Sequence, residues 1–191
     1  MKTFWRWVGT VFFASAFIFL VLTAIGTSLP IEHHASCSAT YFKPASVLFA
    51  ALQDDAGSAM WRSDIASASL VSGRGPTAVW RETDRHGNST TFRTVSFAQD
   101  RSLVRAVDFV PGMPFAGTWS YGLSAVAPDL SQYRPPRPTR LTIIEDGRIY
   151  NPFFRFMARY VFGYTARMHT YLADLAASMH EGAQISCTAN P

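Results

Sequence analysis

The sequence predicts an α+β protein in which a seven-stranded antiparallel sheet wraps around a long C-terminal helix, preceded by one transmembrane helix. Three observations predict this class. A long uncharged stretch opens the chain, short extended segments alternate with turn residues in the middle, and apolar residues recur at the helical period near the end. The 191 residues, 48% of them hydrophobic, are enough for one core, so we expect one domain behind the N-terminal helix.

The N-terminal segment is long enough to span a membrane. The 25 residues between Arg6 and Glu32 carry no formal charge, and an apolar helix needs about 20 residues to cross the hydrocarbon core. Lys2 and Arg6 precede the stretch, and such positive charge stays on the cytoplasmic side. Residues 1–29 are therefore predicted to be a cytoplasmic N-terminus and a single-pass anchor, with the domain on the extracytoplasmic side.

A cleaved signal peptide is the alternative to an anchor. The small residues of Ala24-Ile25-Gly26 have the spacing of a cleavage site. The uncharged stretch is longer than the roughly 7 to 15 apolar residues of a signal peptide, which favours a retained anchor. Both interpretations export the domain.

The exported part has a nearly balanced charge. Without Lys2 and Arg6, 15 cationic residues remain against 13 acidic residues. Basic runs interleaved with aromatic residues are absent from the sequence, so no nucleic-acid partner is expected. Cys37 and Cys187 lie in this exported part, where a disulfide is possible. The sequence leaves open whether they pair or are two small buried side chains.

The domain begins with a strand predicted over 33–41, which ends at Lys43-Pro44 because proline donates no hydrogen bond. Two short helical segments follow, around 44–52 and 58–62. Further extended segments, separated by glycine, proline and asparagine turns, predict an antiparallel meander. These segments are 65–71, 77–83, 89–97, 103–110, 118–126 and 139–146.

The last part of the chain changes to a helical period. Apolar residues from Phe153 to Met179 fall on one broad face, which predicts one long helix over 152–179. Asn151-Pro152 is its start signal, with asparagine as the cap and proline in the first turn. Gly163 is the position where this helix can bend. Residues 182–191 are predicted to be a C-terminal tail.

Three strings carry a family resemblance: WRETDRHG from Trp80, PGMPFAGTWSY from Pro111 and RLTIIEDGRIYNPFFRFMARYVFG from Arg140. They resemble the START-like or SRPBCC superfamily, in its bacterial polyketide cyclase/dehydrase and lipid transport branch. The resemblance covers about 31–181, so the domain is assigned to 30–181. It implies a helix-grip fold, an apolar cavity between sheet and helix, and an anchor in the inner membrane of a bacterium.

The resemblance and the alternation of the strands together predict which residues line this cavity. Trp119 and Tyr121 alternate with small polar residues, and Glu145 shares a face with Leu141 and Ile143. A carboxylate in an apolar cavity could orient a polar head group. The alternative is that Glu145 pairs with Arg81 or Arg105 at the rim. The predicted ligand-binding residues are Trp80, Glu82, Trp119, Tyr121, Glu145, Met157, Tyr160, Tyr164 and Met168.

The same fold implies where the cavity opens. Its mouth lies at the end of the sheet where the first strand starts, and only about four residues, 29–32, separate that strand from the anchor. The mouth should therefore lie close to the bilayer, with Val110, Met113 and Phe115 in contact with the membrane. The alternative is that this apolar turn folds under as a lid or core edge.

The sequence predicts binding of a lipid or other hydrophobic small molecule, for transfer or sensing. It contains no nucleophile elbow, phosphate-binding loop or dinucleotide fingerprint. Its histidines lack the spacing of a metal site, so neither metal nor cofactor is expected. One alternative is an aromatase/cyclase-type enzyme in which Tyr121, Glu145 or Arg81 handles protons. The other is a non-catalytic envelope scaffold whose cavity is filled by its own side chains.

Overall fold

The structure is a computed structural model that describes residues 2–126 and 138–190. The helices are α1 (Lys2–Thr27), α2 (Ala45–Gln53), α3 (Ser58–Trp61), α4 (Pro152–Met157) and α5 (Ala166–Ser178), with a 3-10 turn η1 (Gly75–Thr77) and a π-helical turn η2 (Ala158–Phe162). The strands are β1 (Glu32–Tyr41), β2 (Ile65–Ser72), β3 (Val79–Asp84), β4 (Ser89–Ala98), β5 (Ser102–Val107), β6 (Phe115–Ala125), β7 (Thr139–Ile149) and β8 (Ile185–Asn190).

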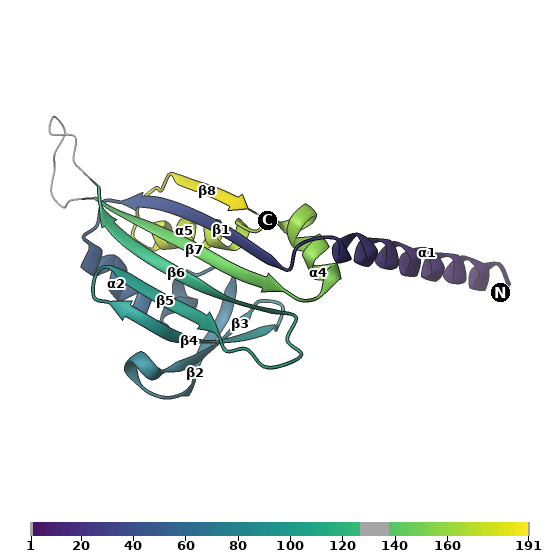
Figure 1. Cartoon of the computed structure of the whole chain (residues 1–191), viewed down its shortest axis with the longest axis horizontal. Coiled ribbons are helices and arrows are strands. Elements are labelled where there is room, and N and C mark those ends of the chain that lie inside the picture. Colours follow the sequence, from purple (N-terminus) through teal and green to yellow (C-terminus); the bar gives the residue numbers. More distant parts are fainter. Residues whose placement is uncertain (1, 127–137, 191) are drawn as a thin grey trace.

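The strands form one antiparallel sheet in the order β2-β3-β4-β5-β6-β7-β1-β8. The sheet curves across α5, and α2 lies beside the end of the sheet away from α1 (Figure 1). The predicted α+β helix-grip architecture is therefore confirmed, but the sheet has eight strands where seven were predicted. The extra strand, β8, comes from the residues predicted to be a tail.

A disulfide between Cys37 and Cys187 joins β1 to β8. The two cysteines lie directly opposite each other in the register of these strands. Local sequence could not decide this pairing, because β8 has only six residues and its partner strand is 150 positions earlier in the chain. Closing so long a loop stabilises a fold by about 2 to 5 kcal/mol.

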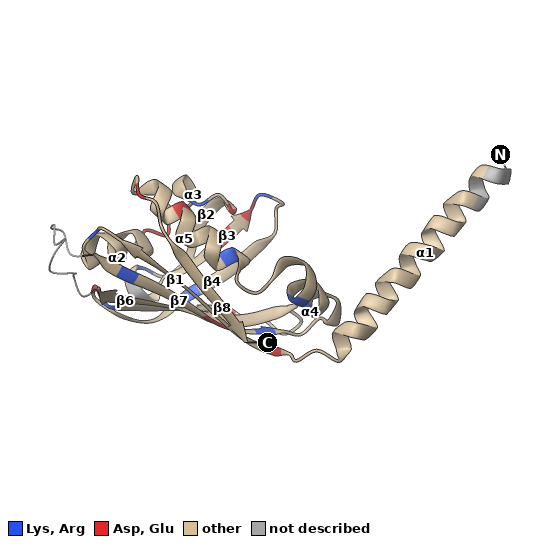
Figure 2. Cartoon of the chain, turned by 90° about the horizontal axis from the view of Figure 1, so that it is seen from above, with Lys and Arg blue, Asp and Glu red and all other residues tan. Residues whose placement is uncertain are grey.

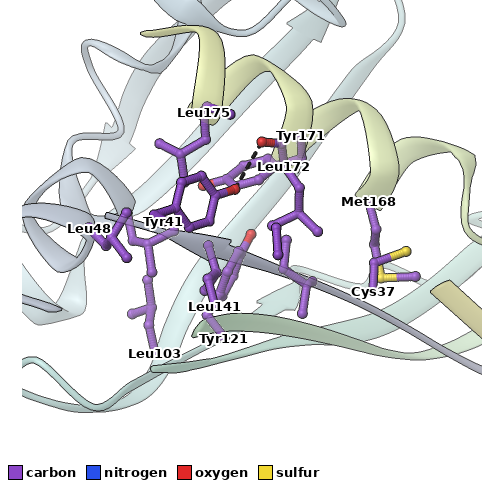
Figure 3. Close-up of a cluster of buried hydrophobic side chains, with 14 of the residues drawn as sticks. Cys37, Tyr41, Leu48, Leu103, Tyr121, Leu141, Met168, Tyr171, Leu172 and Leu175 are labelled. Atoms are coloured by element: carbon purple, nitrogen blue, oxygen red, sulfur yellow. Dashed lines mark hydrogen bonds between the residues drawn. The ribbon is translucent and has the colours of Figure 1, made fainter. Parts of the chain in front are cut away.

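The core lies between α5 and the inner face of the sheet, toward the end where β1 finishes (Figure 3). The side chains of β1 alternate between buried and more exposed positions, as its sequence pattern requires. The Tyr41 hydroxyl donates to the Leu172 carbonyl oxygen at 2.9 Å, which satisfies its one buried polar group. The largest fully buried residues of this core are Tyr41, Tyr171, Phe49, Leu48, Leu52, Leu103, Leu141, Ile143, Met168, Leu172 and Leu175.

The predicted long helix is wrong in one respect, because it is broken in two. Asn151 caps α4 as expected, with Oδ1 accepting from the backbone N–H groups of Phe153 and Phe154. The helix widens in η2 and stops at Gly163, which has a positive φ of 76°. Of the segments that replace the predicted long helix, only α5 packs on the core, and the outer face of η2 is exposed. The apolar pattern is continuous along both segments, so it concealed the break.

The helix α1 projects from the end of the domain where β1 starts and contacts α4 (Figures 1 and 2). The rings of Phe19 and Phe153 have centroids 4.9 Å apart. A Cβ atom on Gly26 would lie 1.9 Å from the Pro152 carbonyl oxygen, so this close approach requires glycine. Beyond this contact α1 is exposed, and Trp7–Thr27 is long and apolar enough to cross a membrane.

Candidate ligand-binding cavity

Two adjoining chambers lie between the sheet and the helices at the end of the domain nearest α1. The outer chamber has a volume of about 440 Å³ and is bounded by β6, β7, α4 and η2. The inner chamber has about 90 Å³ and reaches toward the core. Sites for small molecules commonly have about 300 to 1,000 Å³. The chambers share Thr90, Val107, Gly117, Trp119 and Arg167.

Two glycines of the sheet lie opposite each other beside the outer chamber. Gly117 of β6 and Gly147 of β7 lie opposite each other in the register, and their parity places both on the face that also carries Trp119 and Glu145. A Cβ atom on Gly147 would lie 2.2 Å from Cε1 of His33. The missing side chain therefore lets the imidazole of His33 lie flat against β7.

His33 and Glu145 form a pair in the wall of the outer chamber. His33 Nε2 lies 3.2 Å from Glu145 Oε1, and the imidazole stacks on the Tyr164 ring with centroids 4.5 Å apart. The His33 side chain is 5% exposed and that of Glu145 is 23% exposed. The imidazole is therefore fixed on both faces, while the carboxylate still reaches the chamber.

A network of ion pairs lies beside the inner chamber. It contains Arg62, Arg105, Arg167, Asp55, Asp64 and Glu82. Arg62 is buried, binds both oxygens of Asp64 at 2.7 and 2.9 Å, and also pairs with Glu82. Arg167 reaches the same two carboxylates at 3.2 and 3.4 Å. Each arginine therefore already has a carboxylate partner.

Burial shifts the pKa values of several groups around the inner chamber. It raises the pKa of Asp55 to about 6, an effect that the charge of Arg105, 2.5 Å away, only partly offsets. It raises the pKa of Tyr121 as well, because a phenolate would be fully desolvated there. Burial would also raise the pKa of Asp64, but the hydrogen bonds and charges of Arg62 and Arg167 lower it below its ordinary value.

The chambers bring together six of the nine ligand-binding residues that the sequence predicted. Glu82 and Tyr121 line the inner chamber, Glu145, Met157 and Tyr164 line the outer one, and Trp119 lines both. The other three lie elsewhere: Trp80 is half-buried beside Phe92, Tyr160 is exposed on η2, and Met168 is fully buried in the core.

Neither arginine predicted as a rim partner of Glu145 contacts it, and the residues of the predicted membrane turn differ in exposure. Arg81 is exposed on β3 and Arg105 pairs with Asp55, so neither is the partner of Glu145. In the β5–β6 turn, Val110 is exposed and donates its N–H to Met113 Sδ at 3.2 Å. Phe115 faces the outer chamber.

Sequence reasoning overlooked His33, Arg62 and Arg167, and it considered Arg105 only as a partner of Glu145. His33 shares the parity of Ala35, Cys37 and Tyr41, so the alternation of β1 could have placed it on the inner face. No sequence pattern indicated that the arginines are buried, because an unpaired arginine is expected on the protein surface. Most of the carboxylates that pair with them come from distant segments of the chain. Among residues 2–126 and 138–190, no cluster of three or more histidine, cysteine or acidic residues could hold a metal ion.

Comparison with solved structures supports the fold. A START superfamily protein from Mycobacterium smegmatis matches with a TM-score of 0.56 and 13% identity over 77% of this chain and 99% of that chain. A conserved protein from Geobacillus kaustophilus gives 0.60 and 10% identity over 80% and 98% of the two chains. The Zhui aromatase/cyclase from Streptomyces sp. R1128 gives 0.55 and 14% over 78% and 94%. No protein-family profile and no curated protein matches the chain. The domain therefore has the START-like helix-grip fold, and these identities show the fold alone.

Proposed function

We propose that this protein is a membrane-tethered domain that binds a lipid or other hydrophobic small molecule in its two chambers, for transfer or sensing. The observation that carries the proposal is the outer chamber of about 440 Å³, lined by aromatic and aliphatic side chains and placed directly beside α1. A concave, mostly apolar lining with a few polar groups is typical of small-molecule sites. The ligand contacts proposed are Trp119, Tyr121, Glu145, Met157 and Tyr164.

We propose that α1 is retained as a single-pass anchor in the inner membrane of a bacterium, with the domain on the extracytoplasmic side. The cationic residues of the N-terminus favour this orientation. The disulfide between Cys37 and Cys187 supports it, because such bonds persist in oxidising compartments. The packing of Gly26 against Pro152 supports retention, since α1 acts as a structural element of the domain.

The contact between α1 and α4 supports a mouth that lies within the outer leaflet. The 21 residues of Trp7–Thr27 span about 32 Å as a helix, which only just matches the hydrocarbon core. Phe19 precedes Thr27 by eight residues and so lies about 12 Å inside the extracytoplasmic boundary. The Phe153 ring packs against the Phe19 ring. The start of α4 would therefore lie among the acyl chains.

The exposed residues around the mouth suit this depth. Phe109, Val110, Phe154, Tyr160, Val161 and Phe162 are all large apolar or aromatic side chains with substantial exposure. Arg155 of α4 is buried and donates to the Leu29 carbonyl oxygen at 2.7 Å, which keeps its charge away from lipid. Val110 and Met113 are proposed to extend the membrane contact on the β6 side, with Phe115 at the mouth, where it also lines the outer chamber.

The structure favours binding over the alternative of an envelope scaffold. A scaffold would be expected to fill its cavity with its own side chains, whereas two chambers stay open here. For the enzyme alternative, Arg81 is exposed on β3, and burial raises the pKa of Tyr121, which makes it a weaker acid. These observations support a binding role for the cavity.

Filling the outer chamber tests the proposal. Ala158 of η2 lines this chamber, and Ala158→Trp would occupy it. The full-length chain is purified in detergent and its bound molecules are measured by native mass spectrometry. We expect one apolar molecule per wild-type chain and at least a tenfold lower occupancy in Ala158→Trp.

Ala177→Trp is the matched control, because Ala177 is exposed on α5 and lines neither chamber. This variant should keep wild-type occupancy within about twofold. Equal occupancy in Ala158→Trp and wild type, or a wild-type chain that carries no apolar molecule, would contradict the proposal.

A further inference from the structure

We infer that the ligand is an alcohol, a long-chain or polycyclic amphiphile whose hydroxyl group donates a hydrogen bond to Glu145 in the outer chamber. The inference rests on the proposed function and names the chemistry of its ligand. It follows from the His33–Glu145 pair, from the pairing of the nearby arginines, and from the apolar lining around them.

Glu145 offers a free acceptor to the chamber. Its Oε1 is held by His33 Nε2 at 3.2 Å, and Oε2 has no hydrogen-bond partner among the described residues. An ionised carboxylate can only accept hydrogen bonds. The group that binds Oε2 must therefore be a donor, and a hydrogen bond to a charged acceptor is about twice as strong as a neutral one.

The charged residues around the outer chamber favour a ligand whose hydrogen-bond donor is neutral. Arg148 is paired with Glu32 at 2.9 Å, and Arg167 is paired with Asp64 and Glu82. An anionic head group would face the Glu145 carboxylate, and it would have to share either guanidinium with the carboxylates that already neutralise its charge. A cationic head group would face both guanidinium groups. A hydroxyl group avoids both costs, and the apolar remainder can contact Met157, Phe154 and Phe162.

His33 is a positioning residue for this site. Its imidazole is fixed between Tyr164 and Gly147, so its bond to Oε1 directs the other oxygen of Glu145 into the chamber. His33 Nδ1 is buried and has no partner within the described residues. It therefore presents no accessible base to a ligand, and the pair is suited to recognition.

The chain provides a matched control one residue along each strand. His34 Nδ1 lies 2.7 Å from Asp146 Oδ1, on the outer face of the same two strands, with side chains 55% and 62% exposed. This outer pair has the same kinds of residue but no access to the chamber interior, since neither residue lines the outer chamber.

The test compares dodecanol with dodecyl methyl ether, which has no donor, and with lauric acid. The full-length chain is placed in lipid nanodiscs, and each probe displaces tritiated dodecanol, with empty nanodiscs as the background. In the wild type we expect dodecanol to compete at least tenfold better than the ether, the effect of one charge-assisted hydrogen bond. Lauric acid should compete less well than dodecanol.

Variants of the pair should change this preference. Glu145→Leu should reduce the alcohol-to-ether ratio to about one, and His33→Ala should reduce it severalfold. Glu145→Gln preserves the shape and one acceptor, so it should keep an intermediate ratio even if Glu145→Leu does not fold. Asp146→Asn and His34→Ala should leave the ratio unchanged.

The outcomes separate the two proposals. Saturable binding of alcohol and ether with equal affinity, tighter binding of lauric acid, or an unchanged ratio in the Glu145 variants would overturn the alcohol assignment alone. If none of the probes binds above empty nanodiscs, the proposed function fails as well.

Discussion

The two ends of the sheet are built differently. At the end where β1 finishes, large side chains such as Tyr41, Leu48 and Leu141 are fully buried between the sheet and α5. At the end where β1 starts, two chambers are open beside Gly117 of β6 and the break at Gly163, and large apolar side chains are exposed around them.

This difference places the residues that stabilise the fold and the residues that line the chambers at opposite ends of the sheet. Close packing at one end supplies the apolar burial that stabilises a domain. The other end forgoes that burial and leaves apolar side chains exposed, which the proposed function assigns to lipid and ligand. The ion pairs of Arg62 and Arg167 lie between the two ends. Substitutions at each end should therefore change different measurements.

The largest expected effect is at the packed end. Leu141→Ala should lower the free energy of unfolding by about 2 to 5 kcal/mol, because it leaves a cavity among fully buried side chains. Phe162→Ala at the open end, where the side chain is 65% exposed, should change it by less than about 0.5 kcal/mol. Urea unfolding of the full-length chain in detergent measures both. Equal losses would refute the contrast between the ends.

An intermediate effect is expected where the open end is held in shape. Gly147→Ala places a methyl group against the His33 imidazole, so the ring must leave its stack on Tyr164. We expect a loss of about 1 to 3 kcal/mol in unfolding free energy. Gly122→Ala on β6 is the control, since a Cβ atom there meets nothing within 4 Å. Similar values for both variants would argue that His33 is not fixed by this contact.

The smallest expected effect is on the stability of the fold at low pH, and it comes from Asp64, which pairs with Arg62 and Arg167 between the two ends. The folded-state pKa of Asp64 is lowered, so its contribution is present above about pH 4, the ordinary value, and is lost as the pH falls through the folded-state pKa. Thermal unfolding should therefore show the wild type losing more stability below about pH 4 than Asp64→Asn does. Asp108→Asn, in an exposed pair with Arg93, should behave like the wild type. If the stability of Asp64→Asn fell with pH in the same way as that of the wild type, the lowered pKa of Asp64 would be contradicted.

Much of the site could be predicted from strand alternation. The period of two placed Trp119, Tyr121 and Glu145 on the inner face. Burial alternates along β7, and Tyr121 is the one buried residue of β6. The same rule assigns His33 inward and His34 outward. The partners of these residues could not be predicted, since the contact of His33 with Glu145 joins segments 112 positions apart.

The sequence by itself determined the local features of this protein. The uncharged stretch of α1, the alternation of the strands and the cap at Asn151 depend on neighbours within a few residues, and the structure has each of them. The tertiary structure alone decided the non-local ones. The pairing of β8 with β1, the disulfide and the contact of α1 with α4 join distant segments. Such contacts depend on which surfaces the whole fold brings together, so no local pattern can specify them.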